Sequence, residues 1–250
     1  MIYGVYSWPH WLIISSIMKA VLLVGGQGTR LRPVTYEIPK PLITVGKKPI
    51  VNHAIEFLDR HGIDEVGLLA ARGHADDFRR WRKGWADELP AVKINMFYEE
   101  SPRGTFGGFE VLREWLGNET FVVSNGDDLK DFDLTAMIVA HRKSGAVATV
   151  ALMRVPDPEN FGVPLMEGNR IVRFLEKPSK PPSDFVNGGL YVMEPAVFDY
   201  VDFKKPTVMI ERDLFPALAE GGLLYGFRGE GARCFDCGTL ERWERAMNEW

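Results

Sequence analysis

Residues 19–41, KAVLLVGGQGTRLRPVTYEIPKP, join an apolar run to a glycine-rich turn and to several basic residues. The run at 20–24, AVLLV, has no polar alternation, which is typical of a strand that is covered on both faces of a parallel sheet. The loop behind it carries Arg30, a rigid cationic fork, and three glycines whose backbone N–H groups can approach an anion, Gly25, Gly26 and Gly28. We therefore expect a phosphate-binding loop where this strand ends.

This loop matches neither of two common nucleotide-binding fingerprints. Leu31 stands where a dinucleotide-binding loop has its third glycine, and no Gly-Lys-Ser/Thr triplet follows as in a P-loop. A glycine turn that only reverses the chain stays an alternative, although such a turn has no need of two arginines, Arg30 and Arg32.

Lys40 stands between two prolines, Pro39 and Pro41. Both prolines have fixed φ angles, and Pro41 disfavours the helical conformation at the residue before it, so we expect Lys40 to be extended. Such a stiff loop would fix the direction of the ammonium group. The lysine would then lose little further conformational entropy when it binds a ligand. A solvated lysine in a stiff loop is the alternative.

The pattern beyond this loop predicts one α/β domain. Short β-branched runs alternate with amphipathic stretches, which indicates βαβ units and a Rossmann-like, mixed but mainly parallel central sheet flanked by helices. Two apolar runs around Glu167-Gly168-Asn169 predict a hairpin. The expected strands are residues 20–24, 65–71, 92–97, 121–124, 147–153, 161–165, 171–174 and 189–193, and the expected helices are residues 50–61, 75–85, 107–116, 134–144, 210–219 and 239–248.

Composition excludes several classes of protein. The 250 residues carry a formal net charge of −4, which argues against a dominant nucleic-acid binder. Cys234 and Cys237 are the only cysteines, so there is no disulfide framework, and a reducing, cytoplasmic location is expected.

The apolar residues 1–17 lack the basic start and the cleavage pattern of a signal peptide and are too short to span a bilayer. We interpret them as an appendage before a single domain at 18–250, with a short packing arm or a membrane-surface arm as the alternative.

Two aspartates are candidates for a metal site. Asp127 follows the apolar run 121–124, so we expect it at the carboxyl edge of the sheet, where ligands of open α/β sheets bind. Asp236 precedes a glycine turn and a predicted helix. Carboxylates in such places can hold Mg²⁺ against substrate phosphates. Asp128 and Asp131 leave the assignment open, and a turn or N-cap role is the alternative for each aspartate.

A further group of charged residues ends the predicted hairpin. Glu176 and Lys177 are adjacent, and on a strand their side chains would point to opposite faces. A surface ion pair of little energetic weight is the alternative. Neither Cys234 nor Cys237 has the second ligand pair that a zinc site needs, so we expect both to be structural.

Together these motifs resemble those of the sugar-1-phosphate nucleotidylyltransferases, also called nucleotide-sugar pyrophosphorylases. The resemblance extends from Lys19 to about Trp243, and its most specific part is the spacing G-G-x-G-T-R-L-x-P-x-T…P-K-P. It implies a fold of the nucleotide-diphospho-sugar transferase type. It also implies a Mg²⁺-dependent, in-line transfer of a nucleoside monophosphate from an NTP to a sugar 1-phosphate, with release of pyrophosphate.

The resemblance implies a role for each matching residue. The catalytic residues that contact phosphate would be Arg30, Lys40 and Lys177. The nucleotide would be bound by Gly25, Gly26, Gly28 and Thr29, and by Gly104 and Thr105 of a second glycine loop that contacts the base in this family. The sugar would be bound by Glu176, Asn187 and Gly162, and the Mg²⁺ ion by Asp127 and Asp236.

The second glycine loop departs from the family pattern. Where the family usually has L-G-T-A-G-A, residues 103–108 read RGTFGG, so Arg103 and Phe106 leave the identity of the base open. The Gly-Thr-x-Gly form favours the mannose-1-phosphate guanylyltransferase-like branch. Val24 is a minor departure, since the family usually has an alanine there.

Two other functions stay open. A metal-dependent glycosyltransferase of related fold would use an acidic pair such as Asp127 and Asp128, but it would leave the glycine loop without a purpose. A catalytically silent subunit that binds nucleotide sugars is the second alternative, against which the complete set of charged residues argues. The base, the sugar and the oligomeric state do not follow from the sequence, and a homo-oligomer is compatible with it.

Overall fold

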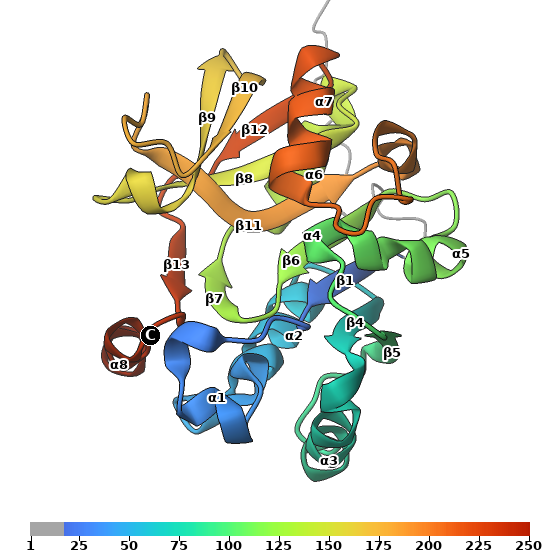
Figure 1. Ribbon diagram of the computed structural model, residues 1–250, viewed down its shortest axis with the longest axis vertical. Helices are drawn as coiled ribbons and strands as arrows, with labels where there is room; N and C mark the ends of the chain where they lie inside the picture. The colour runs from blue at the N-terminus through green and yellow to red at the C-terminus, as the bar shows by residue number, and fades with distance from the viewer. Residues whose placement is uncertain (1–17) are drawn as a thin grey trace, which may run out of the picture.

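A nine-stranded sheet forms the centre of the computed structural model, which describes residues 18–250 (Figure 1). The expected N-terminal appendage, residues 1–17, lies outside the described residues. From one edge to the other, the strands are β5 (Lys93–Glu99), β4 (Glu65–Ala71), β1 (Lys19–Leu23), β6 (Phe121–Asn125), β11 (Phe185–Met193), β8 (Ala148–Arg154), β12 (Leu224–Arg228), β10 (Arg170–Glu176) and β9 (Gly162–Glu167).

Most strands of this sheet run in one direction. The neighbours among β5, β4, β1 and β6 pair in parallel. β11 is antiparallel to both β6 and β8, and β12 is parallel to β8, so β8 and β12 again point the same way as β6. β10 is antiparallel to both β12 and β9, which makes β10 and β11 the reversed strands of this sheet. The expected mixed, mainly parallel sheet is therefore confirmed.

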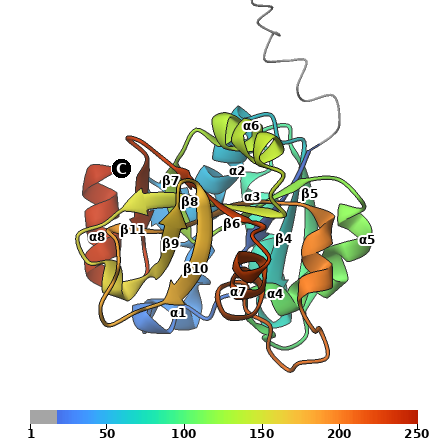
Figure 2. The same ribbon diagram turned by 90° about the horizontal axis from the view of Figure 1, so that it is seen from above.

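Helices cover both faces of the sheet. In β1, Ala20 and Leu22 belong to one buried cluster and Val21 to the other, because successive side chains of a strand point to opposite faces. Figure 2 shows α2 and α6 on one side of the strands and α4 and α7 on the other. The first cluster includes side chains of α2 (Ile50–Arg60), α3 (Ala75–Trp85) and α6 (Leu134–Ser144), and the second includes side chains of α4 (Gly104–Gly107) and α5 (Arg113–Leu116) and of α7 (Phe215–Glu220).

The remaining described elements are short or lie outside the large sheet. The strands are β2 (Thr44–Val45), β3 (Lys48–Pro49), β7 (Asp128–Asp131) and β13 (Arg233–Asp236), and the helices are α1 (Val34–Glu37) and α8 (Leu240–Glu249). The 3-10 turns are η2 (Thr29–Leu31), η3 (Lys40–Leu42), η4 (Arg72–His74), η5 (Gly108–Leu112), η6 (Pro158–Asn160) and η7 (Pro195–Tyr200), and η8 (Ile210–Leu214) is a π-helix.

A two-stranded sheet joins distant parts of the chain. β7 pairs antiparallel with β13, and this register places Asp236 opposite Asp128. α8 follows β13 and contacts the N-terminal half, where Trp243 Nε1 donates to the Thr44 carbonyl oxygen at 3.0 Å. Both views place α8 on the side of the molecule away from α5 (Figures 1 and 2). The pairing of β7 with β13 did not follow from the sequence.

Two expected helices are interrupted in the structure. The stretch expected to be helical at 107–116 is divided into the end of α4, the 3-10 turn η5 and α5. Glycine disfavours a regular helix, and both Gly107 and Gly108 lie here. The stretch expected at 210–219 begins as the π-helix η8, in which the Leu214 N–H donates to the Met209 carbonyl oxygen at 3.3 Å, and the α-helix α7 starts only at Phe215.

The expected extended conformation of Lys40 is wrong. Lys40 begins the 3-10 turn η3, in which the Leu42 N–H donates to the Pro39 carbonyl oxygen at 2.8 Å. This backbone hydrogen bond outweighs the preference that Pro41 imposes on the residue before it. The turn buries the lysine instead of exposing it.

Among residues 18–250, none of the helices combines the length and the apolar character that crossing a bilayer demands.

Candidate functional site

The candidate site begins where β1 and β6 end side by side. These strands are parallel, and Leu23 pairs with Asn125 at their carboxyl ends. One residue later, the Gly126 N–H donates to the Leu23 carbonyl oxygen at 3.0 Å. A side chain at Gly126 would come within 2.5 Å of Val24 Cγ1, so this close approach requires glycine. The glycine loop after β1 and the aspartates after β6 therefore start from neighbouring points.

One left-handed residue shapes the glycine loop. Gly28 has a φ angle of +58°, and its carbonyl oxygen accepts a hydrogen bond of 2.8 Å from the Thr35 hydroxyl. The turn η2 follows at once and exposes Arg30. A side chain at Gly238 would come within 2.6 Å of the Arg30 guanidinium, so this arginine lies against the turn that follows Asp236.

Lys40 is a buried cation within this site. Its ammonium nitrogen lies 2.9 Å from Asp127 Oδ2, 3.3 Å from Asp128 Oδ1 and 3.4 Å from Asp236 Oδ1, and its side chain is 6% exposed. Burial alone lowers the pKa of Lys40, but attraction to the three carboxylates, led by Asp128, outweighs burial and raises the pKa above its ordinary value. A charged lysine thus holds Asp127 and Asp236 close together, as a metal ion shared by the two would require.

The carboxylates of Asp127 and Asp128 beside Lys40 differ in exposure and in the direction of their pKa shifts. Asp128 is 14% exposed, and Lys130 Nζ lies 3.7 Å from its Oδ2. Burial raises the pKa of Asp128, but Lys40 and Lys130 outweigh this effect and lower the pKa. The Asp127 side chain is 32% exposed, yet partial loss of hydration and repulsion from Asp128 raise its pKa despite the attraction of Lys40. The positive charge near Asp127 is therefore too small to balance these effects.

This arrangement fits a hard divalent cation. Asp127 and Asp236 line the pocket with oxygen donors, and the raised pKa of Asp127 indicates that a further positive charge would be stabilised there. Among residues 18–250, no three His, Cys, Asp or Glu side chains form a group that could hold a metal by themselves. Mg²⁺ usually binds through only one or two carboxylates together with substrate phosphates.

The opposite side of the pocket is built from the predicted hairpin, which β9 and β10 form. Gly162 of β9 pairs with Glu176 of β10, and a side chain at Gly162 would come within 2.5 Å of the Phe174 ring. The expectation that Glu176 and Lys177 point to opposite faces is wrong. β10 ends at Glu176, Lys177 has a left-handed φ of +48°, and its ammonium lies 3.8 Å from Glu176 Oε1. Both residues therefore line one pocket.

Strand β11 contributes an asparagine whose amide already has partners. Asn187 Nδ2 donates to the Tyr191 hydroxyl at 2.9 Å, and Asn187 Oδ1 accepts from the Gly189 N–H at 2.9 Å. The pairing of β11 with β8 is irregular between Asn187 and Tyr191. Irregularities of this kind re-aim side chains, and both residues line the pocket.

The second glycine loop packs against the start of η8. Gly104 has a φ angle of +86°, and a side chain there would come within 2.6 Å of the Val208 carbonyl oxygen. The Thr105 hydroxyl accepts from the Ile210 N–H and donates to Glu211 Oε2, both at 2.9 Å. Glu211 itself lines the pocket, and burial raises the pKa of its carboxyl group. The contact of Gly104 and Thr105 with a base stays a prediction.

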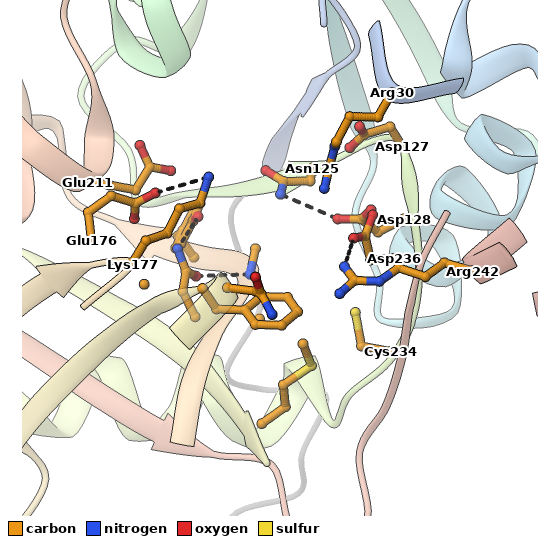
Figure 3. A pocket seen from close by; sticks show the side chains of 18 of the residues that line it. Arg30, Asn125, Asp127, Asp128, Glu176, Lys177, Glu211, Cys234, Asp236 and Arg242 are labelled. Carbon is orange, nitrogen blue, oxygen red and sulfur yellow. Dashed lines mark hydrogen bonds and ion pairs between the residues drawn. The ribbon is translucent and has the colours of Figure 1, made fainter. Parts of the chain in front are cut away.

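One pocket brings most of the predicted site residues together. Figure 3 shows Arg30, Asp127 and Asp236 on one side of it and Glu176 and Lys177 on the other. The predicted residues that line the pocket are Arg30, Lys40, Asp127, Gly162, Glu176, Lys177, Asn187 and Asp236. The predicted residues that do not line it are Gly25, Gly26, Gly28, Thr29, Gly104 and Thr105.

Comparison with known families agrees with this geometry. The residue pattern of the family described as nucleotidyl transferase matches residues 19–250. The chain belongs to the nucleotidyl transferase family.

Similar nucleotidyl transferases are found in animals, plants and bacteria. The chain is 38% identical over 218 residues to the mannose-1-phosphate guanyltransferase beta-A of Xenopus laevis, and the match covers 86% of this chain and 59% of that protein. It is 37% identical over 216 residues to the probable mannose-1-phosphate guanylyltransferase 2 of Arabidopsis thaliana, and the match covers 83% of this chain and 58% of that protein. The chain thus spans about three fifths of the length of the curated relatives it matches.

A solved structure shares the fold of this nucleotidyl transferase. It belongs to a Bacillus anthracis protein named as a glucose-1-phosphate thymidylyltransferase and superposes with a TM-score of 0.84 at 26% sequence identity. The match covers 92% of this chain and 94% of that one.

Two charged residues of the nucleotidyl transferase pocket were missed by sequence reasoning, Glu211 and Arg242. Glu211 lies near the start of a predicted helix, where an acidic residue is ordinary and gives no signal. Arg242 lies in the first turn of α8, where a basic residue is unfavourable. This unfavourable position could have identified Arg242 as a candidate site residue from the sequence.

Both cysteines of this nucleotidyl transferase are free thiols. Cys234 lines the pocket, and Cys237 is fully buried. Burial raises the pKa of each thiol to about 12. Because the thiolate is the form that binds metals and attacks substrates, neither cysteine is suited to either role at neutral pH.

Gly28→Ala is expected to lower the free energy of unfolding by about 1–3 kcal/mol, because an alanine would have to adopt a left-handed φ angle. Its Cβ would also lie 2.8 Å from Thr35 Cγ2. Gly26→Ala is the matched control, since nothing lies within 4 Å of a Cβ at that position. Urea denaturation followed by circular dichroism measures both variants, and equal free energies of unfolding would contradict the role assigned to Gly28.

Proposed function

We propose that this nucleotidyl transferase transfers a nucleoside monophosphate from an NTP to a sugar 1-phosphate and releases pyrophosphate. One observation carries the proposal. A single pocket at the ends of β1 and β6 has Arg30, Asp127 and Asp236 on one side and Glu176 and Lys177 on the other. Asn187 also lines this pocket, and both Glu176 and Asn187 can bind hydroxyl groups. Such a pocket suits a phosphate-rich ligand beside a polyhydroxy ligand.

The proposed reaction needs no nucleophile from the protein. A phosphate oxygen of the sugar 1-phosphate attacks the α-phosphorus of the NTP and forms a new P–O bond. The bond from the α-phosphorus to the oxygen that bridges to the β-phosphorus breaks, and pyrophosphate leaves with that electron pair. The protein has to hold the two phosphates in line and to stabilise the charge that shifts between them.

The charged residues of the chain divide this work between them. Arg30 follows the glycine loop and would bind the triphosphate with its planar guanidinium. Lys177, whose side chain is 65% exposed, would bind the sugar phosphate. Lys40 contacts three carboxylates, so its main task would be to hold them in place, and its effect on the phosphates would be indirect.

Asp127 and Asp236 would hold Mg²⁺. The chemistry supplied by the bound ion would be the neutralisation of negative charge on the phosphate oxygens. The support for this assignment is the contact of both carboxylates with one ammonium group and the raised pKa of Asp127.

GTP and mannose 1-phosphate are the substrates that we propose. Their support is the similarity to proteins named as mannose-1-phosphate guanylyltransferases and the Gly-Thr-x-Gly form of residues 104–107. A cytoplasmic location stays a prediction, and a homo-oligomer stays compatible with the sequence.

Pyrophosphate release by the purified chain tests the function. We expect Mg²⁺-dependent release across a panel of common NTPs and sugar 1-phosphates, with the highest rate for GTP and mannose 1-phosphate and no release after chelation by EDTA. Transfer of sugar from a nucleotide sugar to an acceptor would instead identify a glycosyltransferase. Binding of nucleotide sugars without any pyrophosphate release would identify a silent subunit. Either of these results would overturn the proposal.

A further inference from the structure

Arg242 connects the two sides of the pocket. Its Nη1 donates to Asp236 Oδ2 at 2.5 Å, and its Nη2 donates to Asp157 Oδ2 at 3.1 Å. The guanidinium carbon lies 5.6 Å from the centre of the Phe161 ring. Asp236 belongs to β13, whereas Asp157 and Phe161 flank the turn η6 ahead of β9. Figure 3 shows the contact of Arg242 with Asp236, a proposed metal ligand. The bond to Asp157 joins the same side chain to the segment that leads into β9.

The position of Arg242 is one where a helix disfavours positive charge. The Thr239 hydroxyl caps α8 by accepting from the Arg242 N–H at 3.2 Å, so Arg242 lies in the first turn. The partial positive charge of a helix N-terminus favours acidic residues such as Glu241, which lies in the same turn. A residue that breaks a local rule while making two charge-assisted hydrogen bonds indicates a functional constraint.

The contact between Arg242 and Asp236 helps to fix the orientation of the Asp236 carboxylate. Arg242 binds its Oδ2, and Lys40 lies 3.4 Å from its Oδ1, so cations from two different elements orient the two oxygens. The Arg242 side chain is 31% exposed and that of Asp236 is 20% exposed, which places the pair at the wall of the pocket. Because a guanidinium is a rigid planar fork, Arg242 also sets the separation between Asp236 and Asp157.

We propose that Arg242 is a positioning residue of the transferase reaction. It orients the Asp236 carboxylate, which would hold the metal ion, and couples that carboxylate to the segment 157–161. Metal binding and sugar binding therefore depend on the same side chain. The inference rests on the proposed function, and it assigns Arg242 no contact with the reacting atoms.

Four variants of the full chain separate the two contacts of Arg242. Arg242→Gln removes both ion pairs, and Arg242→Lys keeps the charge without the planar fork. Asp157→Asn removes the partner on the sugar side alone. Arg245→Gln is the matched control, because Arg245 is an exposed arginine of the same helix that pairs with Glu249.

Two measurements report on the two sides of the pocket. Titration with Mn²⁺ alone, followed by the electron paramagnetic resonance signal of the free ion, gives the metal affinity without any turnover. Initial rates of pyrophosphate release give separate KM values for the NTP and for the sugar 1-phosphate.

Arg242→Gln is expected to weaken Mn²⁺ binding by about tenfold or more, since the loss of a residue that orients a metal ligand typically weakens binding about 10- to 100-fold. It should also raise the KM for the sugar 1-phosphate more than that for the NTP. Arg242→Lys should recover part of the Mn²⁺ affinity but not the KM for the sugar 1-phosphate. Asp157→Asn should raise that KM and leave the Mn²⁺ affinity near the wild-type value, and Arg245→Gln should change neither quantity.

Three results would overturn the inference. The first is wild-type Mn²⁺ affinity in Arg242→Gln, even if this variant has a lower Tm. The second is an equal loss of affinity in Arg245→Gln, and the third is a wild-type chain that binds no Mn²⁺. Should the wild-type chain release no pyrophosphate from any substrate pair, the proposed function fails, whereas the Mn²⁺ titration still decides whether Arg242 positions Asp236.

Discussion

Asp127→Ala is expected to slow pyrophosphate release by about a hundred- to thousandfold, the usual effect of removing a preorganised electrostatic contact from an active site. The Asp127 side chain is 32% exposed and lies 2.9 Å from the Lys40 ammonium, so its carboxylate is available to a bound cation from a fixed position. Steady-state release of pyrophosphate at saturating Mg²⁺ measures the loss. The folded structure should survive, because Asp128 and Asp236 still balance Lys40.

Asp131→Ala is the matched control for this experiment. Asp131 ends β7 within the same short stretch, but its side chain is 55% exposed and pairs with Arg60 outside the pocket. We expect turnover near the wild-type value in this variant. Near wild-type release by Asp127→Ala, or equal losses in the two variants, would remove the support for the metal assignment.

Lys40→Met is expected to lower the free energy of unfolding by about 3–5 kcal/mol, the usual effect of removing one partner from a buried ion pair. Methionine has a similar length but no charge, so the carboxylates around Lys40 would lose the cation that holds them. They would then repel one another or take up protons. Denaturation with urea measures the stability, and pyrophosphate release should be lost in the same variant.

Lys177→Met separates stability from function. Both lysines are predicted to act on phosphate charge, but the Lys177 side chain is 65% exposed, whereas that of Lys40 is 6% exposed. Replacing an exposed lysine usually changes the free energy of unfolding by no more than about 0.5 kcal/mol. We therefore expect Lys177→Met to unfold like the wild type while its turnover falls. If Lys40→Met were equally stable, Lys40 would not have the structural role assigned to it.

Features that depend on consecutive residues could be predicted from the sequence. The apolar run 20–24 predicted β1, because a strand that is buried on both faces has apolar residues at consecutive positions, here five of them. The run 121–124 predicted β6 in the same way and placed Asp127 at the carboxyl edge of the sheet. The hairpin of β9 and β10 followed from two apolar runs around a glycine turn.

Features that depend on distant partners could not be predicted. β7 and β13 have four residues each, too few to show a periodic pattern, and their pairing alone places Asp236 opposite Asp128. The direction of Lys177 depends on the φ angle of a single residue. Arg242 showed an unfavourable charge in a helical first turn, but its partners on β13 and beside η6 are known only once the chain has folded.

The late position of β13 sets the order in which this pocket is completed during translation. Lys40 and Asp236 are 196 positions apart, so the ribosome makes the glycine loop and β7 long before β13, the strand that carries Asp236. Until then the nascent chain has an unpaired edge at β7, which is exposed to contacts with other chains. We expect chains that lack β13 not to bind cellular nucleotides. A purified chain that ends before β13 should therefore bind nucleotide more weakly than the full chain.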